Sequence, residues 1–190
     1  MMMEKRNPSP ARFYAMLMIG TGLIALGIML FLLLSGSAPL PAGDEFSTVP
    51  VKVDYAAPEL NLVDMAGDNV SLQNYVGSVV LVNLWATWCP PCKEEMPALQ
   101  SFYERHKSDG FILVGINQEE TPEVVRPFVA DFGLTFPIWL DENYLAQREF
   151  NTLSLPSSFV IDRGGTVRLM WVGAVSEKFL EKHVTKIIKE

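Results

Sequence analysis

Cysteine and histidine are both rare in this chain, with two of each among 190 residues. Cys89 and Cys92 lie three positions apart, so a disulfide between them would close a very small loop and add little stability to the fold. A structural zinc site usually takes four ligands, and neither His106 nor His183 has a ligand's spacing from the cysteines. These shortages argue against both a structural disulfide and a metal site.

An excess of positive charge is also absent. The formal net charge is -7, which argues against broad binding to the phosphate backbone of nucleic acid. The composition, 49% hydrophobic and 19% charged, is that of a globular protein. At 190 residues the chain has room for one ordinary domain and an appendage, and no internal repeat divides it.

The 21 residues of Tyr14–Leu34 lack charge altogether. As a helix rising about 1.5 Å per residue, this run would cross a hydrocarbon core of about 30 Å. Basic residues outnumber acidic ones before it (Lys5, Arg6 and Arg12 against Glu4), which favours a cytoplasmic N-terminus. We therefore predict a cytoplasmic tail over residues 1–13, a single-pass transmembrane anchor in the cell membrane over residues 14–34, and an extracytoplasmic location for the rest.

A cleaved signal peptide is the alternative for this N-terminal segment. The small residues of Ser35–Ala38 suit a signal peptidase, but signal peptides carry shorter apolar regions of about 7 to 15 residues. The length favours an uncleaved anchor, and both alternatives export the remainder of the chain. Residues 35–50, which mix Pro, Gly and Ser, are typical of a linker.

Residues 51–190 alternate between the patterns of buried strands and amphipathic helices. Val79–Trp85 and Phe111–Ile116 are short apolar runs rich in β-branched residues, which favours strands buried on both faces. Further strands are predicted at Phe136–Leu140, Ser158–Ile161 and Val167–Val172, and helices at Lys93–His106, Pro122–Phe132, Glu142–Phe150 and Ser176–Lys189. This order predicts an α/β domain with a central mixed β-sheet flanked by helices.

The two cysteines stand between a predicted strand and a predicted helix, which favours a dithiol that cycles. If Cys89 begins the helix, the partial positive charge of the helix N-terminus would stabilise its thiolate and make it the exposed nucleophile. Cys92, one turn further, would resolve a mixed disulfide by attacking Cys89. Pro90 and Pro91 have no backbone N–H to donate, so thiolate stabilisation should be moderate, which favours a reductant over an oxidant.

The residues around the cysteines resemble a known family. Val82–Pro97, which reads Val-Asn-Leu-Trp-Ala-Thr-Trp-Cys-Pro-Pro-Cys-Lys-Glu-Glu-Met-Pro, is similar to the active-site segment of the thioredoxin-like proteins of the TlpA/ResA family. Ala57–Gly67 resembles that family's opening strand, Gly115–Asp141 its inserted helix and strand, and Leu155–Asp162 its cis-proline loop. The resemblance covers residues 50–190 and implies a thioredoxin-like fold.

The resemblance also implies an activity. It implies a membrane-anchored thiol–disulfide oxidoreductase that reduces disulfides in exported proteins, among them apocytochrome c during cytochrome c maturation. Electrons would come from a membrane thiol-transfer protein. No cofactor is implied beyond a redox-active Cys89–Cys92 disulfide.

Three positions acquire an expected role from the resemblance, each with a structural alternative. Glu95 aligns with a glutamate proposed to transfer protons near the cysteines, or else is an acid stabilised by the helix N-terminus. Pro156 aligns with the cis-proline that presents backbone to a substrate strand, the alternative being a trans loop proline. Asn83 stands where typical thioredoxins keep a buried acid, and we favour a hydrogen-bonded strand residue there.

The resemblance further implies a substrate-binding group made of Trp88, Pro90, Pro91, Leu155 and Pro156. Trp88 is expected to contact a partner, whereas Trp85 is expected to pack. Ser157 and Ser158 replace the threonines common after the cis-proline, which leaves the identity of the target open. Pro97 would kink its helix by removing an internal hydrogen bond.

Three other functions compete with a reductase. A peroxidase of the peroxiredoxin type would need Pro and Thr where this chain has Val82 and Ala86, which argues strongly against it. An exported copper-carrying chaperone would combine the cysteine pair with a histidine, and neither histidine lies in a matching loop. A non-catalytic binding module with a vestigial pair is disfavoured by the intact cysteines and the proline loop.

Overall fold

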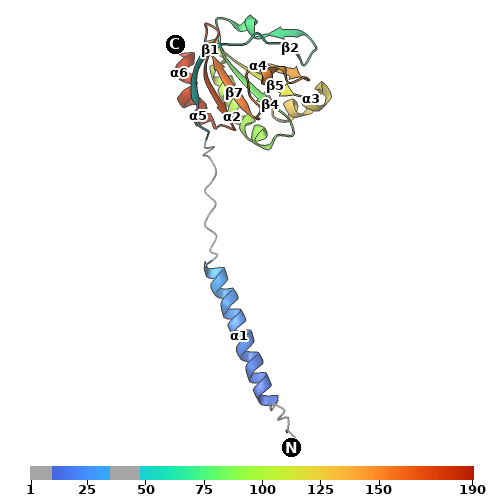
Figure 1. The fold of residues 1–190 in the computed structure, drawn as a ribbon, viewed down its shortest axis with the longest axis vertical. Helices are drawn as coiled ribbons and strands as arrows, with labels where there is room; N and C mark the ends of the chain where they lie inside the picture. The colour runs from blue at the N-terminus through green and yellow to red at the C-terminus, as the bar shows by residue number, and fades with distance from the viewer. Residues whose placement is uncertain (1–9, 35–47) are drawn as a thin grey trace, which may run out of the picture. The chain divides into compact units, whose positions relative to one another are not determined.

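The computed structural model of the protein describes residues 10–34 and 48–190, which belong to two separate units (Figure 1). The first unit contains the helix α1 (Pro10–Leu34). Within the described residues, no helix combines the length and the apolar character needed to cross a membrane. The anchor predicted over residues 14–34 therefore stays a prediction. Residues 1–9 of the predicted tail and residues 35–47 of the predicted linker lie outside the described residues.

The second unit is built around one eight-stranded sheet with the order β1-β8-β7-β4-β5-β6-β2-β3. The central strand β4 pairs in parallel with β5 and antiparallel with β7, so the predicted mixed sheet is confirmed. The strands are β1 (Val51–Ala56), β2 (Asn61–Asp64), β3 (Asn69–Ser71), β4 (Val79–Trp85), β5 (Phe111–Gln118), β6 (Ile138–Asp141), β7 (Ser157–Ile161) and β8 (Thr166–Val172).

Helices flank this sheet (Figure 1). They are the 3-10 helices η1 (Leu72–Tyr75) and η2 (Lys107–Asp109) and the α-helices α2 (Pro90–His106), α3 (Pro122–Asp131), α4 (Leu145–Glu149), α5 (Glu177–His183) and α6 (Thr185–Ile188). Pro97 lies inside α2, which nonetheless continues for more than two further turns.

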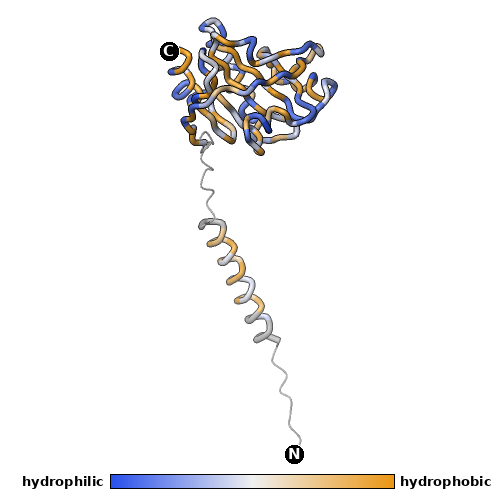
Figure 2. Tube along the Cα trace, turned by 45° about the horizontal axis from the view of Figure 1, so that its top comes forward, coloured by the Kyte–Doolittle hydropathy of each residue, from blue (hydrophilic) through white to orange (hydrophobic). Residues whose placement is uncertain are grey.

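The core lies on both faces of β4, whose seven residues are all buried. Side chains alternate across a strand, so one set faces each side of the sheet. Val79, Leu81 and Trp85 join a hydrophobic cluster with α2, α3, α5 and α6, while Val80, Val82 and Leu84 join a second cluster with α4. Figure 2 shows orange, hydrophobic stretches of the chain inside this domain. Asn83 shares the face of Leu81 and Trp85, beneath α2.

The predicted elements agree with the structure at the centre of the sheet and differ at its margins. The edge strands β1 and β3 were not predicted. The closing helix predicted at Ser176–Lys189 is present but divided into α5 and α6, although Val184 between them keeps right-handed helical backbone angles. Leu180, Val184 and Ile187 are all buried in the same hydrophobic cluster. The apolar pattern therefore continues across Val184, and the sequence does not reveal the division into two helices.

Candidate active site

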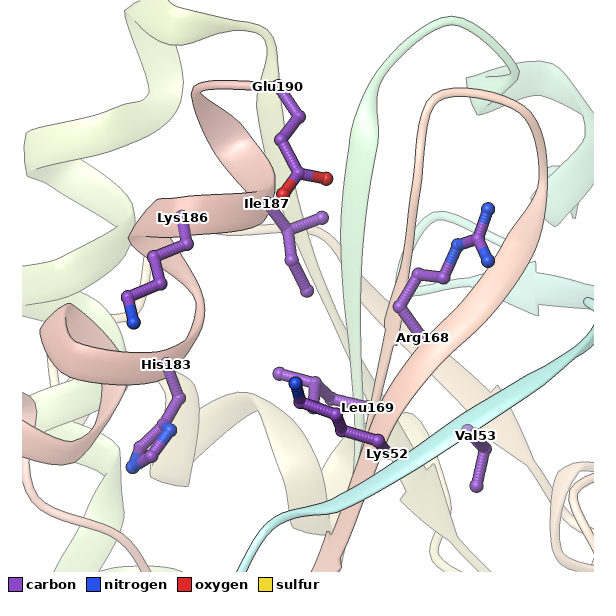
Figure 3. Close-up of a pocket in the computed structure, with 8 residues that line it drawn as sticks. All are labelled: Lys52, Val53, Arg168, Leu169, His183, Lys186, Ile187 and Glu190. Atoms are coloured by element: carbon purple, nitrogen blue, oxygen red, sulfur yellow. The ribbon is translucent and has the colours of Figure 1, made fainter.

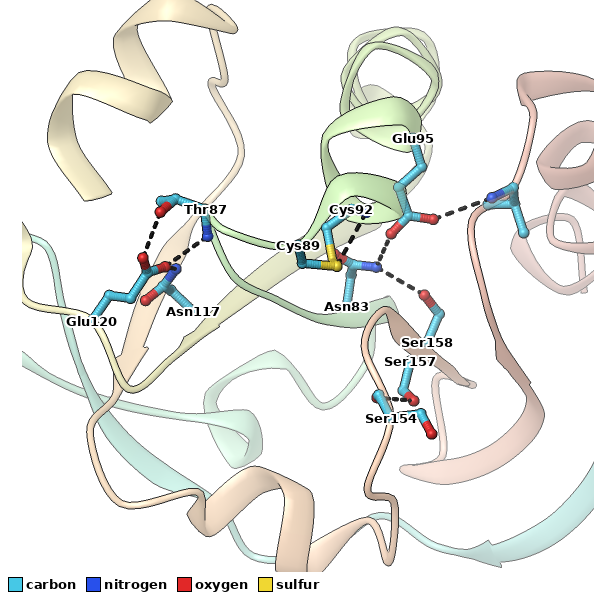
Figure 4. Close-up of a disulfide and its surroundings, with 11 residues drawn as sticks. Asn83, Thr87, Cys89, Cys92, Glu95, Asn117, Glu120, Ser154, Ser157 and Ser158 are labelled. Carbon is cyan, nitrogen blue, oxygen red and sulfur yellow. Dashed lines mark hydrogen bonds between the residues drawn. A yellow bond between two sulfur atoms is a disulfide. The ribbon is translucent and has the colours of Figure 1, made fainter. Parts of the chain in front are cut away.

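Cys89 is the N-cap residue of α2 (Figure 4). Pro90 and Pro91 occupy the first two helical positions, where a missing N–H costs no helical hydrogen bond. The first backbone N–H that can reach the Cys89 sulfur is that of Cys92, and it donates to Cys89 Sγ at 3.3 Å. The two cysteines are joined in a disulfide. The helix therefore gives Cys89 one backbone donor and the positive end of its dipole.

The cysteine pair is buried in this oxidised form. Cys89 keeps 3% of its surface exposed and Cys92 none. The prediction that Cys89 is an exposed nucleophile is therefore wrong for the disulfide form. Packing is the cause, because both cysteines belong to the hydrophobic cluster that also contains Trp85, Ala86 and Met96. A partner can therefore contact only a small part of Cys89 in this form.

Glu95 lies three residues after Cys92, one helical turn further along the same face of α2, and its side chain is fully buried. Burial raises the pKa of its carboxyl group to about 8, although hydrogen bonds from Asn83 and Val175 act in the lowering direction. No charged neighbour contributes to this shift. Glu95 is therefore a buried acid that is mostly protonated at neutral pH.

Asn83 connects Glu95 to the sheet (Figure 4). Its side-chain nitrogen donates to Glu95 Oε1 at 2.8 Å and to Ser158 Oγ at 3.0 Å. The other carboxyl oxygen, Glu95 Oε2, accepts from the backbone N–H of Val175 at 3.2 Å. The hydrogen-bonded strand residue expected at Asn83 is confirmed, and the carboxyl group joins α2 to β4 and to the loop before α5, with β7 bonded to Asn83 through Ser158.

The loop before β7 carries the expected cis-proline, because the Leu155–Pro156 peptide bond is cis. The carbonyl of Pro156 already accepts from the N–H of Gly173 at 2.9 Å, and proline has no N–H. No hydrogen bond in the described part of the chain uses the backbone of Leu155. The backbone groups left for a substrate strand are therefore those of Leu155.

Side chains on either side of the cis-proline brace this loop. Ser157 Oγ and Thr152 Oγ1 share a hydrogen bond of 2.8 Å, and Ser157 Oγ donates to the carbonyl of Ser154 at 2.7 Å. Leu153, between them, is 95% exposed. Residues 152–157 thus form a braced loop that holds the apolar side chain of Leu153 in solvent.

The predicted substrate-binding residues differ in how accessible they are. Trp88 is 61% exposed, Pro90 is exposed, Pro91 and Leu155 are half-buried, and Pro156 is buried. Trp85 is fully buried, as expected of a packing residue. Trp88 and Pro90 are thus the members whose side chains a partner can contact most readily.

A carboxylate that sequence reasoning did not single out holds the chain just before the cysteines. Glu120 Oε2 accepts from the N–H of Thr87 at 2.7 Å and Glu120 Oε1 accepts from its hydroxyl at 2.5 Å (Figure 4). Asn117 Nδ2 donates to Glu120 Oε2 at 2.7 Å. The available signal was the position of Asn117 near the end of β5 and of Glu120 just after it, since the carboxyl ends of the parallel strands β4 and β5 lie side by side.

Neither histidine lies at the disulfide. His106 is the last residue of α2 and contacts Asp109 and Glu181. His183 lines a cleft between β1, β8 and the C-terminal helices that contains none of the predicted site residues (Figure 3). In residues 10–34 and 48–190, no group of three or more His, Cys, Asp or Glu side chains could hold a metal ion.

The fold and the site together define a class of protein. A mixed sheet flanked by helices, a CxxC disulfide at a helix N-terminus and a cis-proline loop before β7 are the parts of a thioredoxin-like thiol–disulfide oxidoreductase.

Comparison with known proteins gives the family. Residues 53–170 match the AhpC/TSA family. Thiol-disulfide oxidoreductase ResA of Geobacillus kaustophilus is 35% identical over 137 residues, which cover 72% of this chain and 79% of that protein. Thioredoxin-like protein YneN of Bacillus subtilis is 33% identical over 137 residues, which cover 70% of this chain and 79% of that protein.

A solved structure agrees with these relatives. The thiol:disulfide interchange protein, a thioredoxin family protein, of Chlorobium tepidum has a TM-score of 0.65 and 30% identity, over 73% of this chain and 99% of its own. The chain therefore belongs to the AhpC/TSA family, among its ResA/TlpA-like thioredoxins, and it is a protein-disulfide oxidoreductase.

Proposed function

We propose that this protein reduces disulfide bonds in other proteins outside the cytoplasm, with Cys89 as the nucleophile and Cys92 as the resolving cysteine. The observation that carries the proposal is the Cys89–Cys92 disulfide at the first turn of α2 with the buried acid Glu95 one turn behind it. The sulfurs and the carboxyl group supply the nucleophile, the second thiol and a local proton acceptor that disulfide reduction needs.

The chemistry follows in two exchanges. In the reduced protein the Cys89 thiolate attacks a target disulfide, which forms a mixed disulfide and releases one target sulfur as a thiolate. In the minority of molecules whose Glu95 is ionised at neutral pH, the Cys92 thiol then gives its proton to this carboxylate and attacks Cys89 Sγ. The bond between Cys89 and the target breaks, the second target thiolate leaves, and the target has gained two electrons while the protein becomes the disulfide.

Reduction is the proposed net direction because thiolate stabilisation at Cys89 is limited. One backbone N–H, that of Cys92, reaches Cys89 Sγ, and the two prolines between the cysteines add none. Strong oxidants of this fold owe their potential to an unusually stable thiolate. The free backbone of Leu155 would hold the target chain beside the exposed part of Cys89.

The proposed location is the outer face of the cell membrane, with the uncharged segment Tyr14–Leu34 as anchor. Apocytochrome c is a candidate target, because its haem-binding cysteines must be reduced before haem attaches, and a membrane thiol-transfer protein is the candidate electron donor. Protease digestion of intact cells and of opened cells tests the location. Degradation of the domain only in opened cells would place it in the cytoplasm and refute this part of the proposal.

Trapping of mixed disulfides tests the reaction. Cys92→Ser keeps the nucleophile and removes the resolving thiol, so target proteins should accumulate on Cys89 and be released by dithiothreitol. Cys89→Ser, with the buried Cys92 intact, is the matched control and should trap nothing. Equal trapping by both variants, or none by Cys92→Ser, would refute the assigned roles.

A further inference from the structure

Glu95 has hydrogen-bond donors around its carboxyl group but, among the described residues, no acceptor for the proton of its acid form. Both carboxyl oxygens face donors, Asn83 Nδ2 at 2.8 Å and the Val175 N–H at 3.2 Å. This arrangement satisfies an ionised carboxylate, which only accepts hydrogen bonds. A protonated carboxyl group must donate one, and neither neighbour accepts. Since burial raises the pKa of Glu95 to about 8, the protonated form needs a different partner arrangement at neutral pH.

The missing acceptor lies on the same side chain. Asn83 is fully buried, and its oxygen Oδ1 has no hydrogen-bond partner in the described part of the chain. A carboxamide is nearly symmetric in shape, so a half turn about its last bond exchanges Nδ2 and Oδ1. After that turn Oδ1 would face Glu95 and accept from its O–H. The cost is an unpaired amide nitrogen in place of an unpaired oxygen, so neither orientation is fully satisfied.

Ser158 suits both orientations. Its hydroxyl accepts from Asn83 Nδ2 at 3.0 Å, and a hydroxyl can rotate to donate to an oxygen placed at the same point. The serine is fully buried, and Asn83 is the only hydrogen-bond partner of its hydroxyl among the described residues. The pair can therefore follow the protonation state of Glu95 without moving the backbone.

We propose that Asn83, supported by Ser158, is a positioning residue that turns its amide with the proton on Glu95, donating to the carboxylate and accepting from the acid. The inference rests on the proposed role of Glu95 as proton acceptor for Cys92. As Cys92 transfers its proton to Glu95 and attacks Cys89, the amide turns so that the new O–H finds an acceptor. When the acid later returns its proton to a cysteine thiolate of the reduced site, the amide turns back.

The surroundings restrict this exchange to a few groups. Glu95 shares the helix α2 with the cysteines, and it is faced by Asn83 from β4, by Ser158 through Asn83 from β7, and by the Val175 N–H from the loop before α5. None of these neighbours carries a permanent charge. The orientation of the Asn83 amide, and not an ion pair, therefore responds to the protonation state of Glu95.

Nuclear magnetic resonance on the full-length oxidised protein tests the turn directly. With isotope labels on the asparagine side chains and the glutamate carboxyl carbons, the Asn83 amide signals should shift with the same midpoint pH as the Glu95 carbon. Asn117, another buried amide that donates to a carboxylate, Glu120, is the internal control and should stay constant over this range. Constant Asn83 signals across the titration of Glu95 would overturn the proposal.

A matched pair of variants tests the consequence for turnover. Asn83→Val and Asn83→Thr have nearly the same shape, but only threonine can both donate and accept. Asn83→Val removes the donor to the carboxylate, which should raise the midpoint of the kcat–pH profile by about one pH unit. The reaction at pH 7 should then be about tenfold slower, with KM unchanged. Asn83→Thr should recover part of that shift, and identical profiles for the two variants would contradict the assigned role.

The failure of this inference and the failure of the proposed function give different results. A wild-type protein that reduces no disulfide while its Asn83 signals follow Glu95 would refute the function and keep the turn. Normal turnover with unresponsive Asn83 signals would refute the turn alone. If Asn83→Val does not fold, the wild-type titration still decides.

Discussion

Glu95 links the stability of the domain to pH, because its carboxyl group is buried in the folded state and solvated in the unfolded chain. Its pKa is about 8 when folded and 4.5 in the ordinary solvated state. Between these values the unfolded chain has lost the proton that the folded protein keeps, so unfolding releases a proton. The stability that this residue contributes is thus fully present below pH 4.5 and is lost as the pH rises to about 8.

The first prediction is a fall of about 4 kcal/mol in the free energy of unfolding of the oxidised protein across that interval, attributable to Glu95. Urea unfolding at several pH values measures it. Glu95→Gln is the control, because it removes the titration and keeps the shape, so its stability should change much less with pH. An unchanged slope in this variant would assign the pH dependence to other groups.

The second prediction concerns Pro91, which occupies the second helical position. The N-cap side chain accepts from the N–H of the second or third helical residue, and Pro91 blocks the former. Pro91→Ala should add a donor to the Cys89 thiolate, worth about 1.5 kcal/mol or about tenfold more thiolate at neutral pH. The reduction potential should become more oxidising.

The control for Pro91→Ala is Pro90→Ala, at the first helical position, whose N–H is not directed at the N-cap side chain. Ultraviolet absorbance of the thiolate and equilibration with glutathione measure the two quantities. Equal effects of the two variants would show that helix rigidity, and not the added N–H, sets the potential.

At the residue scale the cysteines are identified by their spacing and their place before a predicted helix, whereas Glu95 is singled out by the family resemblance. The sequence does not identify Glu120 or the partners of Ser158. Those contacts depend on which residues of β5 and β7 lie beside β4, and the register of a strand pair is not encoded in either strand alone. The burial of Cys89 was missed for a related reason, since the covering side chains come from several elements.

At the scale of elements, β4 and α2 are the best predicted part of the fold. The seven buried residues of β4 form one apolar run, and α2 follows with its apolar residues on one face. The edge strand β1 has no such pattern, because five of its six residues are exposed and the sixth is half-buried. Pairing with β8 makes it a strand, and that pairing joins residues more than 100 positions apart.

The third prediction concerns the contact between the loop after β5 and the loop before α2. Glu120→Ala removes the acceptor of both the N–H and the hydroxyl of Thr87, and hydrogen bonds to charged groups contribute about 1.5 to 3 kcal/mol. We expect a loss of about 2 kcal/mol in the free energy of unfolding and faster hydrogen exchange at the Thr87 amide.

The matched control for Glu120→Ala is Glu119→Ala. Glu119 is adjacent, and its side chain makes no hydrogen bond or ion pair with any described residue. Urea unfolding and amide exchange compare the two variants. If both lose the same stability, the loop after β5 matters for its shape and not for the carboxylate that holds Thr87.

At the scale of the whole molecule, the chain divides into two units. The helix α1 belongs to the first, and the core clusters draw only on residues of the second. The family match, residues 53–170, also lies within the second unit. The location of the domain and its chemistry should therefore be separable by truncation.

The fourth prediction is that a fragment of residues 48–190 folds alone. It keeps the bond from Thr48 Oγ1 to the carbonyl of Ala174, 2.9 Å, which lies next to the loop residue that donates to Glu95. Its unfolding midpoint in urea and its rate of disulfide reduction should match those of the full chain. If the proposed anchor is right, the fragment should leave the membrane fraction.

A shorter fragment of residues 57–190 separates the role of β1 from that of the tether. This fragment lacks β1, so the edge of β8 is exposed. An unpaired edge strand can pair with other chains. We therefore expect the shorter fragment to aggregate or to unfold at lower urea concentration, although it keeps both cysteines and Glu95. Equal behaviour of the two fragments would show that β1 is dispensable, and instability of both would show that the catalytic domain requires the segment before residue 48.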